Sequence, residues 1–238
     1  MMETANSNDV KLTIIEHLDE LRRRLVVCSI SVLVTSLVAL VFVRNIFEIL
    51  FLPAGPDFKP IYTGMTEMLT TYFKVGILTG VAISLPIIVY HVVRFVAPAM
   101  TPREQRYFFL LLPGVVVCFL VGVVFGYFLL LPWSAKYLLT TFSDIATPFI
   151  TVGSYISFVS TMLFFIGLAF ETPLILYFLA KIRLVNAKKL ASMRKFAFVG
   201  AFVVGAIITP TVDPIAQSIV AIPLILLWEI GILLARVA

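Results

Sequence analysis

The sequence predicts an all-α, polytopic membrane protein with six transmembrane helices, of which the last two are short. Two observations support this prediction. Hydrophobic residues make up 61% of the 238 residues and charged residues only 13%, whereas soluble domains have about 45–50% apolar and about 25% charged residues. The apolar residues also fall into long stretches without Lys, Arg, Asp or Glu, and about 20 such residues cross a bilayer as a helix. A water-soluble globular protein is therefore excluded.

Six segments of the chain are apolar enough to be candidate spans. The first four are long enough to cross about 30 Å of hydrocarbon at about 1.5 Å per residue. The fifth has 13 apolar residues before Thr209, and the sixth has 14 before Glu229. We therefore expect the bilayer to thin around this hairpin, or partner helices to cover it. The expected organisation is an N-terminal amphipathic segment, residues 1–24, followed by spans at residues 25–43, 72–95, 108–132, 156–180, 196–211 and 214–235.

Basic residues are distributed unevenly between the two sides of these spans. With the N-terminus inside, 14 of the 18 Lys and Arg residues lie in cytoplasmic segments. Because cytoplasmic loops are enriched in Lys and Arg, we expect both termini to be cytoplasmic. The net charge of +5 is then a sign of topology. Nucleic-acid binding would need a basic soluble module, which the sequence does not contain.

The sequence lacks the motifs of enzymes and of metal sites. No Gly-rich phosphate loop is present, and the only histidines, His17 and His91, lie near the ends of two different spans. Cys28 and Cys118 lie in separate apolar runs, without the spacing of a disulfide framework or a zinc site. We therefore expect no catalytic activity, no cofactor and no metal.

Two acidic residues stand out on the predicted cytoplasmic side. Glu20 lies in the amphipathic stretch before the first span, and Glu104 follows Thr101 and Pro102 before the third. Each has a structural explanation, since Glu20 can pair with Arg24 one turn further on and Glu104 can complete a capping box. Carboxylates are nevertheless sparse on this basic face. They could also select a cationic ligand, and the donors of a guanidinium group suit them.

Glu171 is an acidic residue within a predicted span. It lies ten residues before Lys181, about 15 Å from the end of its helix. An ionisable group at that depth is costly unless it is neutral, partnered or facing a wet cavity. A functional role in a partly hydrated groove is therefore the first interpretation. The alternative is a protonated side chain bonded to a neighbouring helix.

These segments together resemble the TatC family, the core of the twin-arginine translocase. The resemblance runs from about residue 13 to residue 235, with the segments in the family's order. A departure is the turn at residues 209–214, where the family often has a tighter Thr-Pro-Pro-Asp, so Asp213 is assigned no more than a loop role. The matching segments are HLDELRRR (17–24), FVAPAMTPREQR (95–106), GLAFETP (167–173), FVGAFVVGAIITP (198–210) and AIPLILLWEIG (221–231).

The resemblance implies a glove-like bundle in the prokaryotic cytoplasmic membrane. Its function would be to bind signal peptides that carry paired arginines and to export folded proteins using proton-motive force. Glu20 and Glu104 would receive the arginine pair, and Glu171 would line the concave intramembrane face. Supporting residues at the arginine site would be His17, Arg22 and Phe95. The last two helices, with Gln217, would dock the single-span proteins TatA and TatB. Gly205 and Thr209 are further docking candidates from the residues themselves, because small and polar side chains mediate helix association in lipid.

Two other functions remain open from the residues alone. A proton-coupled small-molecule transporter would explain Glu171, but neither of the cytoplasmic acids. A structural scaffold would explain the short hairpin, but would tolerate the loss of both Glu20 and Glu104. The translocase receptor is preferred because it accounts for all of these features together.

Overall fold

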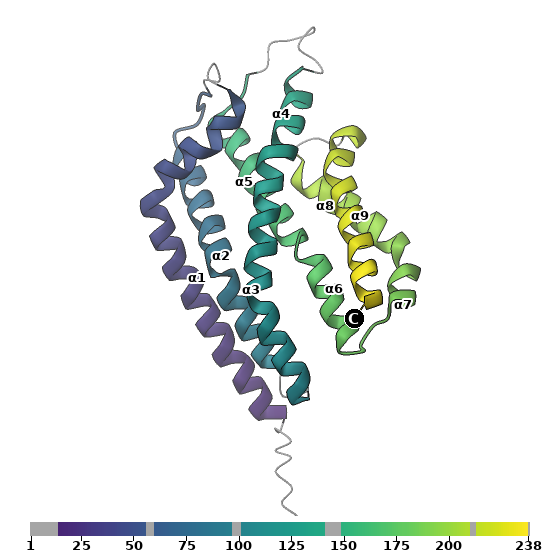
Figure 1. The fold of residues 1–238 in the computed structure, drawn as a ribbon. Coiled ribbons are helices and arrows are strands. Elements are labelled where there is room, and N and C mark those ends of the chain that lie inside the picture. The colour runs from purple at the N-terminus through teal and green to yellow at the C-terminus, as the bar shows by residue number, and fades with distance from the viewer. Residues whose placement is uncertain (1–13, 56–59, 97–100, 141–148, 210–212, 238) are drawn as a thin grey trace, which may run out of the picture.

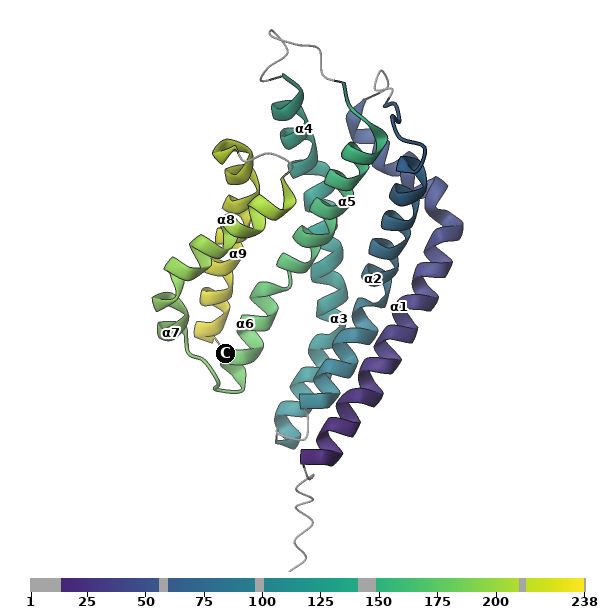
Figure 2. The same cartoon turned by 180° about the vertical axis from the view of Figure 1, so that it is seen from behind.

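The computed structural model of the chain describes residues 14–55, 60–96, 101–140, 149–209 and 213–237. Regular structure in these residues is helical, apart from an isolated bridge between Ile61 and Thr151. The helices form an elongated bundle, and α1, α2 and α3 diverge from α6, α7 and α9 towards one end (Figures 1 and 2). We call that end, where α1 begins, the lower end, and the end that carries α4 the upper end. The predicted all-α fold is confirmed.

The first two helices are a long antiparallel pair. Helix α1 (Ile14–Phe51) continues without a break from the amphipathic segment into the first span, and a 3₁₀ turn (Leu52–Ala54) follows it. Helix α2 (Glu67–Val96) returns to the lower end. The two backbones approach closely at Gly80, where an added Cβ would lie 2.5 Å from the backbone nitrogen of Ser36. The Thr35 hydroxyl also donates a 2.8 Å hydrogen bond to the Gly80 carbonyl.

The next helices bring the chain through the centre of the bundle. Helix α3 (Pro102–Phe125), a π-helical turn (Gly126–Leu130) and α4 (Leu131–Thr140) follow one another directly. Helix α5 (Val152–Ala169) is capped by the Thr151 side chain, which accepts a hydrogen bond from the Ser154 N–H. Side chains of α5 lie at the middle of the largest apolar cluster and are fully buried: Ile156, Val159, Met162 and Ile166.

The fourth span is broken near its middle. Helix α5 ends at Ala169, and α6 (Thr172–Lys181) begins after a turn at residues 170 and 171. Pro173 explains the break, because its ring removes the N–H that would bond to the carbonyl of Ala169. The sequence alone had suggested that Glu171 lies inside a continuous helix. In the structure it lies at a helix break.

The chain ends in a helical hairpin. After α7 (Ala187–Ser192), helix α8 (Arg194–Ile208) has 15 residues and α9 (Pro214–Val237) has 24. Five helical segments of the described chain are long and apolar enough to cross a membrane, and α8 is not among them. At about 22 Å, α8 is shorter than the hydrocarbon layer. Helix α9 continues past Glu229 as far as Val237, and the Arg194 guanidinium donates two 2.7 Å hydrogen bonds to the Glu229 carboxylate.

Polar contacts tie the loops at the upper end together. The Val152 N–H donates to the Ile61 carbonyl over 2.8 Å, and the Glu67 carboxylate accepts from the N–H groups of Thr63 and Gly153. Asp213 accepts a 2.7 Å hydrogen bond from the Tyr137 hydroxyl and a 2.9 Å bond from the Ala216 N–H, so it caps α9 and links it to α4. These bonds lower the pKa of the Asp213 carboxyl.

Candidate functional site

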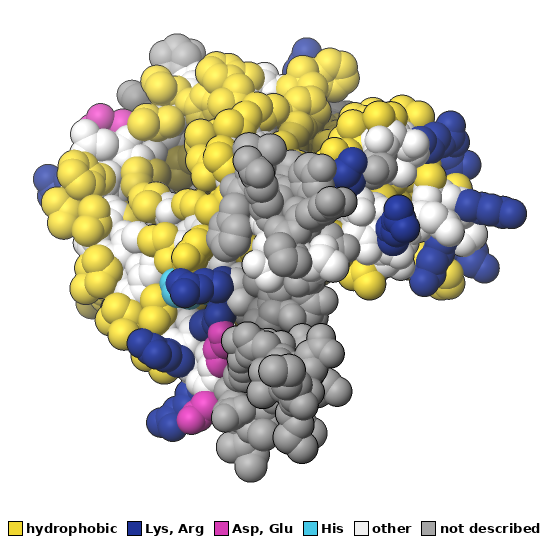
Figure 3. Space-filling view, turned by 60° about the horizontal axis from the view of Figure 1, so that its bottom comes forward, with side chains coloured by type: hydrophobic (Ala, Val, Ile, Leu, Met, Phe, Trp, Pro, Cys, Tyr) yellow, Lys and Arg dark blue, Asp and Glu magenta, His cyan; other side chains and the backbone are white. Residues whose placement is uncertain are grey.

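Charged side chains gather at the lower end of the bundle. Basic residues form one group over the start of α1 and the end of α2, and a second group over α7 and the start of α8 (Figure 3). The sides of the bundle, by contrast, carry large exposed apolar side chains along α1, such as Leu33, Leu37 and Val41. The molecule therefore has an apolar girdle and a basic lower end.

Glu20 projects from the first turns of α1 into the first basic group. Its Oε1 atom forms an ion pair with Nη2 of Arg24, one turn further along the helix. The other Arg24 nitrogen, Nη1, donates a 3.1 Å hydrogen bond to the backbone carbonyl of His91 on α2. Glu20 Oε2 is shielded from solvent and has no hydrogen-bond partner among the described residues. One carboxylate oxygen is thus occupied, while the other remains available as an acceptor.

Two further residues expected at this site, His17 and Phe95, contact each other, and His17 lies next to Glu20. The His17 ring stacks on the Phe95 ring with centroids 4.3 Å apart and planes 15° apart, which joins the start of α1 to the end of α2. His17 Nδ1 is 3.9 Å from Glu20 Oε2, within ion-pair distance when the imidazole is protonated. The structure therefore brings His17, Glu20 and Phe95 together.

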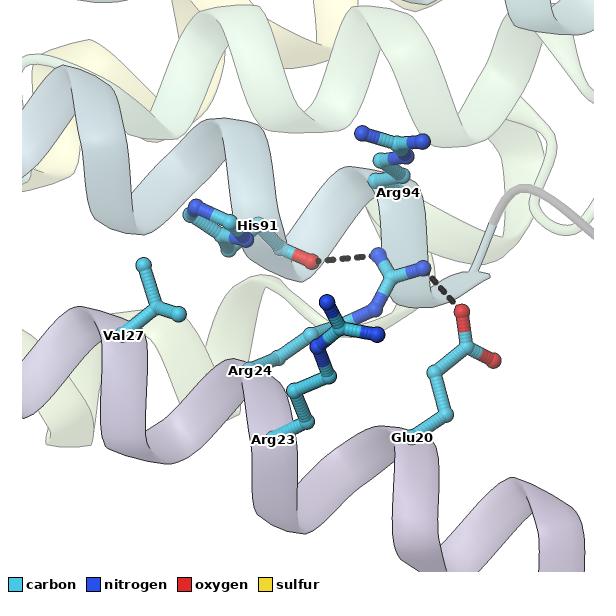
Figure 4. A pocket seen from close by; sticks show the side chains of 6 residues that line it. All are labelled: Glu20, Arg23, Arg24, Val27, His91 and Arg94. Carbon is cyan, nitrogen blue, oxygen red and sulfur yellow. Dashed lines mark hydrogen bonds and ion pairs between the residues drawn. The ribbon is translucent and has the colours of Figure 1, made fainter.

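A pocket of ≈ 320 Å³ lies between α1 and α2, and Glu20 and Arg24 are among its lining residues. Figure 4 shows the Arg24 side chain lying across the pocket between Glu20 and the His91 backbone, with the guanidinium groups of Arg23 and Arg94 on either side. Arg22 points elsewhere, and lines a neighbouring open pocket of ≈ 520 Å³ together with Asp19 and Glu20. Among its described lining residues, the pocket between α1 and α2 thus combines the Glu20 carboxylate with three guanidinium groups.

Glu104 lies in the first turn of α3, which also begins at the lower end. Its side chain lies outside the described residues, as do the N-terminal residues 1–13. The expectation that Glu20 and Glu104 lie within reach of a single arginine pair therefore stays a prediction.

Glu171 occupies a second, separate position at the break between α5 and α6. Its side chain is 6% exposed, and its Oε1 atom has no hydrogen-bond partner among the described residues. The carboxyl group lines a cavity of ≈ 300 Å³ between α2, α3 and α6. The other lining residues are apolar: Val89, Val92, Val93, Val115, Leu174, Ile175 and Phe178. A carboxyl oxygen without a described partner therefore faces an apolar cavity.

The three residues expected to dock partner helices lie where α8 meets α9. Gly205 and Thr209 are buried, and the Thr209 hydroxyl donates a 2.9 Å hydrogen bond to the Gly205 carbonyl. A Cβ at Gly205 would lie 3.0 Å from the backbone carbonyl oxygen of Gln217. Gln217 itself is a half-buried residue of α9. The exposed side of α8 is instead formed by Val199, Gly200, Val203 and Ile207.

Sequence reasoning missed two features of these sites. The i, i+4 spacing indicated the pair of Glu20 with Arg24, but nothing local indicated the bond of Arg24 to His91, 67 residues away. The cap formed by Asp213 was also missed, although Asp before a proline-led helix is a typical N-cap signal.

Comparisons with known proteins agree on one family. A family model described as "Sec-independent protein translocase protein (TatC)" matches residues 16–223. Proteins of that name are 42% identical in Aquifex aeolicus, over 94% of each chain, and 33% identical in Carboxydothermus hydrogenoformans, over 96% of this chain and 94% of the other. A crystal structure described as the twin arginine translocase receptor TatC superposes with a TM-score of 0.84 at 41% identity, and covers 93% of this chain and 99% of the other.

Proposed function

The chain belongs to the TatC family of Sec-independent protein translocase proteins, and on that premise we propose that its lower end receives signal peptides that carry an arginine pair. In this family the protein is a multi-pass membrane component of a translocase and not an enzyme. The proton-coupled transporter is accordingly not favoured. The lower end is then the cytoplasmic end, in a bacterial inner membrane, with both termini on that side.

The observation that supports this proposal best is the environment of Glu20. A carboxylate with a free, shielded acceptor oxygen lies beside an aromatic stack at the basic end of the bundle. Charge-assisted hydrogen bonds from a guanidinium to such an oxygen contribute roughly 1.5–3 kcal/mol each. Glu104, at the start of α3, would receive the second arginine. His17 and Phe95 would hold Glu20 in place, and Arg22 would line the approach.

Photo-crosslinking tests where the peptide binds. A photoreactive phenylalanine analogue at position 95 should crosslink to a synthetic twin-arginine signal peptide when the full chain is embedded in lipid nanodiscs. The same analogue at Phe128, which is exposed on the π-helical turn beyond the middle of the bundle, is the matched control. Crosslinking at both positions alike, or at position 128 only, would contradict the proposed site.

The partner proteins TatA and TatB are proposed to dock on the hairpin. The exposed stripe of Val199, Gly200, Val203 and Ile207 offers a smooth apolar face, and nothing lies within 4 Å of a Cβ added at Gly200. Helices associate in lipid through such small residues and through interhelical hydrogen bonds. Gly205, Thr209 and Gln217 would then act from the α8–α9 contact beneath this stripe, with Gln217 supplying polar atoms at its edge.

We expect Gly200→Leu to reduce co-purification of the single-span partner severalfold while the free protein keeps its thermal stability. Nothing lies within 4 Å of a Cβ added at Gly200, so the new side chain would start from open space on the docking face. Gly205→Leu is the contrasting variant, because its side chain would collide with the α9 backbone and should lower stability and partner binding together. Normal partner recovery with Gly200→Leu would exclude docking on this stripe.

Glu171 is proposed to act as a neutral hydrogen-bonding anchor for an inserted peptide or partner helix. Its Oε1 atom is buried and unpartnered among the described residues, so a polar group that enters the cavity would find a partner there. Glu171→Gln keeps the hydrogen-bonding capacity and should retain most transport, whereas Glu171→Ala should lose at least tenfold. The measurement is export of a folded reporter protein by cells with each variant.

A control variant separates this role from the shape of the cavity. Ile175→Ala enlarges the same cavity without removing a polar group, and should affect export less than Glu171→Ala. Equal loss with Gln and Ala at position 171 would indicate proton exchange at this residue. Full export with both would leave Glu171 with a structural role.

A further inference from the structure

The carboxylate that we assign to the arginine pair is already bound by an arginine of the same chain. Arg24 pairs with Glu20 Oε1 through one nitrogen and holds the His91 carbonyl through another (Figure 4). Both side chains are largely shielded, with 14% of Arg24 and 27% of Glu20 exposed. Arg24 therefore holds one of the two carboxylate oxygens that the fork of a signal-peptide guanidinium would engage.

The charge of the pocket also disfavours simple addition of a peptide. Among its described lining residues, one carboxylate faces the guanidinium groups of Arg23, Arg24 and Arg94. A peptide that brings two further positive charges into this pocket would be repelled while Arg24 neutralises Glu20. The incoming guanidinium gains the full attraction of Glu20 only if it takes the place of Arg24 on the carboxylate.

We propose that Arg24 is an internal competitor that occupies Glu20 in the empty receptor and is exchanged for a signal-peptide arginine on binding. This inference rests on the proposed function. The exchange breaks one charge-assisted pair and forms another of the same kind, and Arg24 keeps its hydrogen bond to the His91 carbonyl as it swings away. No proton moves and no net charge is created.

An internal competitor changes affinity in a defined way. If peptides bind only the fraction of receptors in which Glu20 is free, every dissociation constant rises by the inverse of that fraction. The ratio of affinities for two peptides stays the same. At working peptide concentrations a pair of arginines still binds, because guanidinium groups fit carboxylates in a fork geometry. A pair of lysines then binds too weakly to be retained. Arg24 would thus set the threshold that a signal peptide must exceed.

The test compares three variants of the full chain in nanodiscs, titrated with fluorescent signal peptides that carry Arg-Arg or Lys-Lys. Arg24→Gln should bind both peptides about three- to tenfold more tightly, with the ratio between them unchanged. The shorter glutamine side chain gives up both the ion pair with Glu20 and the bond of Nη1 to the His91 carbonyl, so thermal unfolding must show that α1 and α2 stay packed. Arg23→Gln is the matched control, because it removes the same charge from the same pocket without breaking a contact to Glu20. Arg23→Gln should raise peptide affinity less than Arg24→Gln does, and this smaller gain should disappear at high salt, which screens the charge of Arg23.

Weaker Arg-Arg binding by Arg24→Gln would mean that Arg24 supports peptide binding. Equal gains in affinity from Arg24→Gln and Arg23→Gln would mean that only the positive charge of the pocket matters. Either result overturns the proposal. The third variant, Glu20→Gln, tests the proposed function itself, since unchanged Arg-Arg binding there would remove Glu20 from the receptor site. Lost binding in Glu20→Gln with no change in Arg24→Gln would refute the competitor alone. Thermal unfolding of each variant confirms that the fold is retained.

Discussion

Replacement of both Glu20 and Glu104 by glutamine should lower the affinity for a twin-arginine peptide by at least a hundredfold, and either replacement alone by at least tenfold. Glutamine keeps the size of the side chain but removes the negative charge, so each charge-assisted bond of roughly 1.5–3 kcal/mol becomes a weaker neutral one. A loss of about 1.4 kcal/mol is a tenfold change in affinity. Titration of a labelled peptide against the purified chain measures this directly.

The control for this experiment is Asp19→Asn. Asp19 is exposed and adjacent to Glu20 on α1, so the substitution changes the net charge of the lower end by the same amount as either single glutamine replacement. It should alter peptide affinity by less than threefold, an effect that salt suppresses. Unchanged binding by the double glutamine variant, or an equal loss with Asp19→Asn, would refute carboxylate recognition of the arginine pair.

Gly80→Ala should destabilise the protein by about 3 kcal/mol or more, the upper range for overpacking of a core. The added methyl group would overlap the backbone of Ser36, which cannot rotate out of the way as a side chain could. Helices α1 and α2 would have to separate, and the bond from the Thr35 hydroxyl to the Gly80 carbonyl would lengthen. Thermal unfolding in detergent, with the yield of monodisperse protein, measures the effect.

Gly200→Ala is the matched substitution for Gly80→Ala. Gly200 is also a helical glycine, but nothing lies within 4 Å of its added methyl group. Alanine favours the helix over glycine by about 0.8–1.0 kcal/mol, so this variant should be as stable as the parent chain or slightly more stable. A Gly80→Ala variant that unfolds at the same temperature as Gly200→Ala would show that α1 and α2 are not packed this closely.

Hydropathy and charge were sufficient to predict the architecture. The exclusion of charged residues from a bilayer defines the long spans, and the interruption at Thr209 predicted the short α8. The break beside Glu171 was less evident, although Pro173 was visible, because proline can also kink a helix without ending it. Local sequence therefore predicted where helices run better than where they end.

The arrangement of the candidate site depended on contacts between distant residues. The stack of His17 on Phe95 and the bond of Arg24 to His91 each join α1 to α2, and no local pattern encodes the rotation of one helix against the other. The same holds for Gly205. Small residues on α8 indicated close helix packing, but only the rotation of the helix assigns Gly205 to the contact with α9 and Gly200 to the exposed face.

The short length of α8 has a consequence for how the protein enters the membrane during synthesis. A helix of about 22 Å, with Arg194 and Lys195 at its start, has too few apolar residues to remain in the bilayer alone. Its closest packing in the described chain is with α9, through Gly205 and the pair of Arg194 with Glu229. We therefore expect α8 to become a stable span only once α9 is available to pack against it, so that the two helices enter the bilayer as a pair.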